Sequence, residues 1–166
     1  LHQVFVGSTG VIGRVLPIDC ITTSVPTLIG RLSIAGGAQA ARAILTTDLK
    51  PKTVTVQGRI GGRVVTIGGM AKGSGMIHPN MATMLAYLTT DAAIAPAALQ
   101  HALKSAVDQS FNCITVDGDT STNDTVLCLA NGLAKNSLIR QGTAHYRRFT
   151  QLLTEASEQL ALAICR

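Results

Sequence analysis

The feature that most constrains the fold is a pair of alternating stretches with two glycines between them. Residues 53–57 and 63–67 alternate apolar and polar side chains, and Gly61 and Gly62 lie between the two stretches. Alternation with a period of two is typical of half-buried strands. A glycine pair between two such stretches is a hairpin signal. The sequence therefore predicts an antiparallel hairpin in the first half of the chain.

Helical spacing follows later in the chain. Residues 96–110 place apolar side chains on one face behind Pro96, a residue that suits the first turn of a helix. Residues 144–164 carry a longer amphipathic pattern, and residues 26–45 carry a third that Gly36 and Gly37 interrupt, which leaves one helix or two open. Further strands are expected at residues 3–7, 84–88, 113–116 and 125–130. Helices and strands that alternate without a repeat predict an α/β fold.

Composition narrows the class of protein. A chain of 166 residues can bury one ordinary core, and with 46% hydrophobic but 3% aromatic residues that core is built from Ala, Val, Ile and Leu. Charged residues make up 14%, which argues against disorder. The net charge of +5 is scattered without an aromatic-basic stripe, so we expect no nucleic-acid binding. No run reaches the roughly 18 apolar residues of a membrane span, so no membrane partner is expected.

Metal and nucleotide motifs are incomplete. The four cysteines are widely spaced and form no zinc-binding pair, so they are interpreted as small buried hydrophobes in a reducing compartment. Residues 117–124 begin like a calcium loop, but Thr122 stands where glycine is needed and Cys128 where glutamate is needed. Glycines 7, 10 and 13 lack the spacing of a dinucleotide fingerprint. We therefore expect no metal and no bound cofactor.

Thr83 is a candidate nucleophile. It follows a Pro-Asn turn and opens an apolar run, directly after Ala82. A threonine hydroxyl needs a neighbouring base, and an N-terminal threonine carries that base as its own α-amine. Because Thr83 is internal, this role requires the chain to cut itself between Ala82 and Thr83. The alternative interpretation is a β-branched residue that simply begins a strand.

Four sequence words occur together in this chain: STGVIG at residues 8–13, TTD at 46–48, KGSGMIHPNMATML at 72–85 and DGDTSTND at 117–124. In this order they resemble the ornithine acetyltransferase family, also called bifunctional glutamate N-acetyltransferase, of the cyclic route of arginine biosynthesis. The resemblance runs through nearly all 166 residues.

The resemblance assigns roles to single residues. Thr83 matches the nucleophile and self-cleavage point, and it also belongs to the substrate site. Thr9 and Gly10 match the oxyanion hole, where a hydroxyl and a backbone N–H can donate to a tetrahedral intermediate. Lys72 and Thr46 match substrate-binding positions, although the adjacent Thr47 leaves the threonine assignment open by one residue. The family carries the word at 117–124, but no catalytic role transfers to it.

The resemblance also implies the whole protein. The expected fold is the layered α-β-β-α arrangement shared with self-cleaving aminopeptidases. Residues 1–82 would end the α chain and residues 83–166 would begin the β chain, in an α2β2 assembly. The implied reaction moves acetyl from N-acetylornithine to glutamate through acetyl-Thr83, without metal or organic cofactor. Some family members also use acetyl-CoA as donor, and the sequence leaves open whether this one does.

Two rival hypotheses stay open. One is a self-cleaving aminopeptidase of the same fold, with a different pocket, and the other is a non-catalytic fragment that only contributes to assembly. The chain begins without methionine and in what is expected to be a strand, so a fragment of a longer protein is expected. The expected compartment is the cytoplasm for a bacterial source and an organelle for a fungus or plant.

Overall fold

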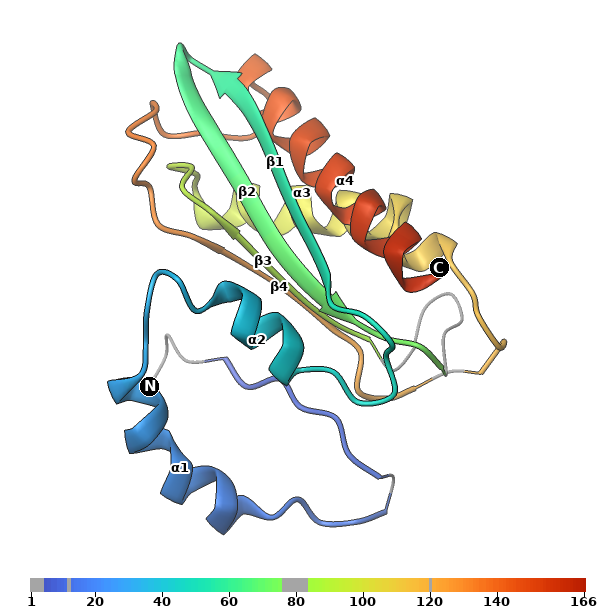
Figure 1. The fold of residues 1–166 in the computed structure, drawn as a ribbon. Coiled ribbons are helices and arrows are strands. Elements are labelled where there is room, and N and C mark those ends of the chain that lie inside the picture. The colour runs from blue at the N-terminus through green and yellow to red at the C-terminus, as the bar shows by residue number, and fades with distance from the viewer. Residues whose placement is uncertain (1–4, 12, 76–83, 120) are drawn as a thin grey trace.

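The computed structural model describes residues 5–11, 13–75, 84–119 and 121–166 (Figure 1). One sheet has the strand order β1-β2-β3-β4. β1 pairs antiparallel with β2, β2 antiparallel with β3, and β3 parallel with β4. The elements in chain order are α1 (Ile18–Gly30), α2 (Gly37–Ala43), β1 (Lys52–Ile60), β2 (Arg63–Lys72), β3 (Leu85–Thr90), α3 (Pro96–Gln109), a short 3₁₀ helix (Phe111–Cys113), β4 (Thr125–Ala130) and α4 (Ala144–Ile164).

The predicted hairpin is confirmed as β1 and β2. Ile60 pairs with Arg63 across the turn, and Gly61 and Gly62 have φ values of 57° and 77°. Positive φ at both central residues defines the turn whose twist suits a two-residue hairpin, and glycine adopts it without steric cost. The register places alternate β1 side chains on one buried face. Local sequence therefore decides this half of the sheet, from the edge strand β1 to the inner strand β2.

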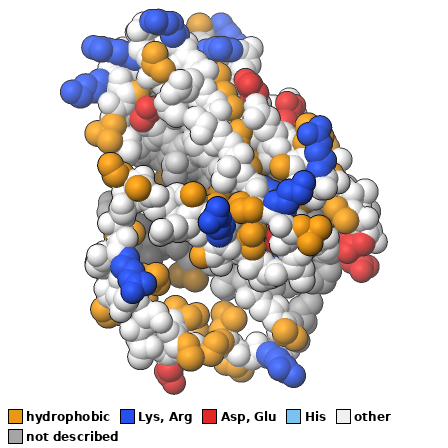
Figure 2. Space-filling view, viewed as in Figure 1, with side chains coloured by type: hydrophobic (Ala, Val, Ile, Leu, Met, Phe, Trp, Pro, Cys, Tyr) orange, Lys and Arg blue, Asp and Glu red, His pale blue; other side chains and the backbone are white. Residues whose placement is uncertain are grey.

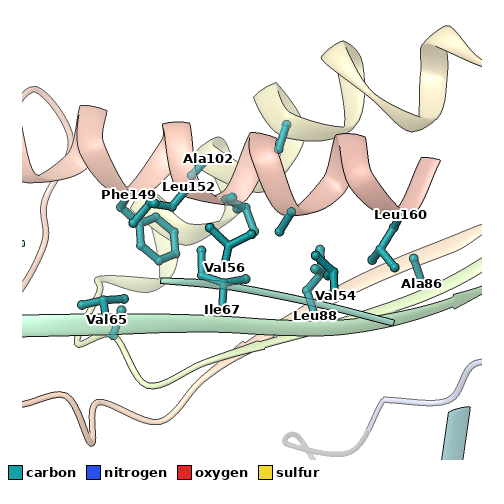
Figure 3. Close-up of a cluster of buried hydrophobic side chains, with 14 of the residues drawn as sticks. Val54, Val56, Val65, Ile67, Ala86, Leu88, Ala102, Phe149, Leu152 and Leu160 are labelled. Atoms are coloured by element: carbon teal, nitrogen blue, oxygen red, sulfur yellow. The ribbon is translucent and has the colours of Figure 1, made fainter. Parts of the chain in front are cut away.

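α3 and α4 cover one face of the sheet, as their amphipathic patterns predict (Figure 1). α4 presents Phe149, Leu152 and Leu160 to the strands, and Figure 3 shows these side chains between the helix and the sheet. The helix approaches closely because β1 offers a glycine beneath it. A Cβ built on Gly58 would lie 2.6 Å from Leu152 Cδ1. The α/β class is thus confirmed, and α3 and α4 form one helical layer on the four-stranded sheet.

Two predicted strands are wrong where the structure describes them. Residues 5–7 have no regular structure, and Phe5 and Val6 are 61% and 85% exposed; residues 3 and 4 lie outside the described part. Residues 114–116 are not a strand, because a 3₁₀ turn ends at Cys113 and the chain then runs into the polar loop. A short apolar run does not specify a strand by itself, since a strand also needs a partner.

The interrupted helical pattern resolves into two helices. α1 begins at Ile18, earlier than the pattern predicts, and contains Pro26. α2 begins after Gly36, so the glycine pair marks the break. None of the residues of α1 is buried, and several of its large apolar side chains are exposed, including Leu28 and Ile29. Figure 2 shows hydrophobic side chains at the surface in the lower part of the view, where α1 lies.

The expected burial of the cysteines is also wrong. Cys20, Cys113 and Cys165 are exposed, and only Cys128 is partly buried. Cys20 lies on the uncovered α1 and Cys165 lies just past the end of α4. Burial raises the pKa of the Cys128 thiol to about 12. In the described part of the chain, no helix is long and apolar enough to cross a membrane.

Candidate functional site

Three strands bring the site together at one end of the sheet. β2 ends at Lys72, which pairs with Leu85 at the start of β3, and Leu85 pairs in turn with Thr125 at the start of β4. Lys72 therefore lies opposite the segment that directly follows Thr83. Ala82 and Thr83 themselves lie outside the described residues. Their predicted roles as cleavage point and nucleophile, and the boundary between residues 82 and 83, stay predictions.

Lys72 joins the other predicted residues. Its side chain is almost fully buried, at 2% exposure. Lys72 Nζ donates to Thr9 Oγ1 at 3.4 Å and to Thr46 Oγ1 at 3.3 Å. The Thr47 hydroxyl lies instead 2.5 Å from that of Ser74. The structure thus brings together three residues that are far apart in the sequence, and of the two adjacent threonines it is Thr46 that contacts Lys72. The substrate-binding role of Thr46 stays a prediction.

Gly10 follows Thr9 in an exposed loop. Both residues line a cleft of about 230 Å³, together with Asn123 from the loop before β4. Thr122 and Asn123 of the word at residues 117–124 therefore border the cleft. No group of three or more acidic, histidine or cysteine side chains among the described residues is arranged to hold a metal ion.

Two aspartates balance the buried charge of Lys72. Burial lowers the pKa of Lys72, while the carboxylates of Asp48 and Asp124 act in the opposite direction. Asp48 Oδ1 accepts from Lys52 Nζ at 2.6 Å and from the backbone N–H of Gly73 at 2.7 Å. Burial raises the pKa of Asp48, but these hydrogen bonds outweigh burial and the net pKa lies below its ordinary value. Asp48 is therefore an anion at neutral pH.

The pKa of Asp124 is shifted in the opposite direction, above its ordinary value. Its Oδ1 accepts from the backbone N–H of Met84 at 2.7 Å. Burial raises the pKa of Asp124 to about 6, although the Met84 N–H and the charge of Lys72 both lower it. Sequence reasoning gave no role to Asp48 or Asp124. The available signal was that each is the last residue of a matched word: Asp48 ends TTD at residues 46–48, and Asp124 ends DGDTSTND at residues 117–124.

We expect Asp124→Asn to raise the melting temperature of the full-length protein that carries this sequence. The folded pKa of Asp124, about 6, lies above the ordinary value of 3.8, so its stabilising contribution is present below pH 3.8 and is lost as the pH rises through 6. The neutral amide avoids that loss. The gain should be largest above about pH 7 and shrink between about pH 6 and pH 4 in thermal melts. A gain of equal size at every pH would contradict this explanation.

The fold and this cluster define a mixed α/β protein with a buried lysine held between two threonines at one end of its sheet. The model of the ArgJ family matches residues 1–166. The chain therefore belongs to the ArgJ family.

Curated relatives agree with this family. The arginine biosynthesis bifunctional protein ArgJ of Symbiobacterium thermophilum is 58% identical over 161 residues, which cover 97% of this chain and 40% of that protein. The proteins of the same name from Thermosynechococcus vestitus and Listeria monocytogenes are 52% and 51% identical, and the matches cover 39% and 41% of their lengths. A crystal structure of the Bacillus halodurans protein is 45% identical, covers 47% of this chain and 37% of that chain, and has a TM-score of 0.45. The chain spans about 40% of the length of these curated relatives.

Proposed function

We propose that the full-length protein that carries this chain transfers acetyl from N-acetyl-L-ornithine to L-glutamate through an acetyl ester on Thr83, after it cuts itself between Ala82 and Thr83. The observation that carries the proposal is the buried Lys72 ammonium between the hydroxyls of Thr9 and Thr46, at the sheet end where β3 begins. Membership of the ArgJ family, whose relatives are named for arginine biosynthesis, supports the same pathway.

Self-cleavage would create the catalytic base. The Thr83 hydroxyl attacks the Ala82 carbonyl, the peptide C–N bond breaks, and an ester links the two residues. Water hydrolyses that ester and leaves an Ala82 carboxylate and a Thr83 α-amine. A free α-amine has a pKa of about 7.7–8.0, so a neutral fraction near pH 7 can accept the proton of the adjacent hydroxyl.

Acetyl transfer would then follow in two halves. The Thr83 oxygen bonds to the acetyl carbon of N-acetylornithine, the C–N bond breaks, and the proton taken by the α-amine leaves with ornithine. The amine of glutamate attacks the acetyl ester, which forms N-acetylglutamate and restores the Thr83 hydroxyl. A protein that uses one covalent acetyl intermediate in this way follows ping-pong kinetics.

The observed hydrogen bonds suit the expected roles of the neighbours. A lysine ammonium can only donate, so the Thr9 oxygen accepts from Lys72 and the Thr9 hydrogen stays available to donate. With the backbone N–H of Gly10, that hydroxyl would stabilise the oxyanion of each tetrahedral intermediate. The charge of Lys72, and the hydroxyl of Thr46 beside it, would bind a carboxylate of the amino-acid substrate.

The rest of the protein belongs to the same proposal. The α and β chains of one precursor would assemble as α2β2, in the cytoplasm of a bacterial source or an organelle of a fungus or plant. The reaction as written needs no metal or organic cofactor. Acetyl-CoA is a second donor to be tried with glutamate.

The half-reaction tests the proposal. Full-length protein given N-acetylornithine alone should yield a piece that begins at Thr83 and carries one added acetyl group in its intact mass. Isotope-labelled ornithine should exchange into N-acetylornithine without glutamate. Hydrolysis of peptide amides with no acetyl exchange would favour the aminopeptidase instead. A folded protein that shows neither activity would overturn the proposal in favour of a non-catalytic role.

Thr9→Ala should lower kcat about 100- to 1,000-fold, because one oxyanion donor is lost. KM should change little, since the donor acts in the transition state. Thr47→Ala is the matched control. Thr47 is the same residue type, but its hydroxyl lies against that of Ser74, so kcat should be kept. Steady-state kinetics of acetyl transfer measures both. An equal loss of kcat in the two variants would argue against a specific role of Thr9.

A further inference from the structure

Met84 is held on both sides by two consecutive residues of another part of the chain. Its N–H donates to Asp124 Oδ1 at 2.7 Å, and its carbonyl accepts from the N–H of Thr125 at 3.0 Å. The Met84 side chain is also buried, at 6% exposure. The backbone directly after Thr83 is therefore fixed by the start of β4, and one of the two bonds comes from a side chain.

The ionised carboxylate of Asp124 is an energetically unfavourable acceptor for that hydrogen bond, because burial disfavours its charge. It lies partly buried, and an ionised carboxylate that loses water destabilises the fold unless its partners compensate. Among the described residues its partners are the backbone N–H of Met84 and, through space, the charge of Lys72. A costly charged group beside a site is typical of residues kept for function at the expense of stability.

We propose that Asp124 is a positioning residue that holds the Met84 N–H and thereby sets where the preceding Thr83 presents its hydroxyl and, after cleavage, its α-amine. This inference rests on the proposed function of Thr83. Asp124 would change the reaction rates only through the position of Thr83, since it neither transfers a proton to the substrate nor forms a bond with it. A shift of about 1 Å in the reacting groups can cost about 100-fold in rate.

The experiment compares Asp124→Ala with Asp124→Asn in the full-length protein. Cell-free synthesis followed by intact mass over time gives the rate of self-cleavage, and kinetics of the cleaved fraction give kcat and KM. The alanine variant should cleave about 100-fold more slowly, and its kcat should fall with little change in KM. The asparagine variant keeps an oxygen that accepts from Met84, so it should recover most of both rates.

Asp91 offers a matched control at the other end of β3. Its Oδ1 accepts from the backbone N–H of Thr66 at 2.8 Å, the same type of bond at nearly the same length. It follows Thr90, the last residue of β3, about 20 Å along the chain from Met84. Asp91→Ala should lower the melting temperature but leave the cleavage rate and kcat at the level of the parent.

The outcomes separate a failure of the positioning role of Asp124 from a failure of the proposed function. Positioning by Asp124 is supported if Asp124→Ala cleaves slowly, Asp91→Ala cleaves at the rate of the parent, and Asp124→Asn recovers most of that rate. Asp124→Ala that cleaves as fast as the parent overturns the inference, as does equal slowing in Asp91→Ala. Asp124→Asn as slow as Asp124→Ala overturns the role of the hydrogen bond. A folded parent that never cleaves means instead that the proposed function itself is wrong.

Discussion

The full-length protein with Thr83→Ala is expected to stay a single uncut chain and to transfer no acetyl group. Alanine has no hydroxyl to attack the Ala82 carbonyl, so neither the ester nor the free α-amine can form. Both stages of the proposed chemistry are lost together, which makes this the largest expected effect. Intact mass and the acetyl-exchange assay measure the two stages separately.

Thr83→Ser is the matched variant, because serine keeps the hydroxyl and should still cleave and transfer acetyl. The thermal melts of the uncut alanine variant should show a cooperative transition, so that loss of folding does not explain loss of cleavage. Two pieces from the alanine variant, with the second beginning at residue 83, would contradict the mechanism. Cleavage would then use a nucleophile other than the Thr83 side chain.

Asp48→Ala is expected to lower the free energy of unfolding by about 3–5 kcal/mol, the usual cost of removing one partner from a buried ion pair. The side chains of Asp48 and Lys52 are 0% and 10% exposed, and their charged atoms lie 2.6 Å apart. The variant leaves the Lys52 ammonium buried without its partner and also removes the acceptor of the Gly73 N–H. Denaturant unfolding of the full-length protein measures the loss.

The ion pair of Lys104 and Asp108 supplies the control. It has the same spacing in the sequence and a similar distance, 2.7 Å, but its side chains are 72% and 49% exposed. Asp108→Ala should change stability little, because water and salt screen an exposed pair. The Asp48 pair differs from the Asp108 pair in burial and in the added hydrogen bond from the Gly73 N–H, so equal losses would contradict the argument. Because the folded pKa of Asp48 is lowered, the parent loses the stability that the Asp48 carboxylate provides as the pH falls below about 3.9. The free energy of unfolding of the parent should therefore approach that of Asp48→Ala at low pH.

Local patterns determined much of the framework. The hairpin of β1 and β2, α3 and α4 follow from periodicity and from turn residues such as Gly61 and Pro96, and all are found where they were predicted. Each of these signals is contained within about 20 neighbouring residues, and neighbouring residues set backbone torsions and capping. The matched words also gave the family, which the family model confirms.

Long-range contacts decided the rest. The apolar stretches at residues 5–7 and 114–116 looked like strands, yet a strand exists only where another strand supplies its hydrogen bonds. The exposure of Cys20 likewise depends on what covers α1, which its own sequence does not state.

The candidate site shows the same division. The sequence by itself determined which residues are candidates for the site, since Thr9, Thr46 and Lys72 lie in the matched words. Only the tertiary structure decided that the Lys72 ammonium lies buried between the two hydroxyls and that Asp124 holds the backbone of Met84. The physical reason is that these contacts join residues 26 to 63 positions apart, so they exist only once the strands have paired.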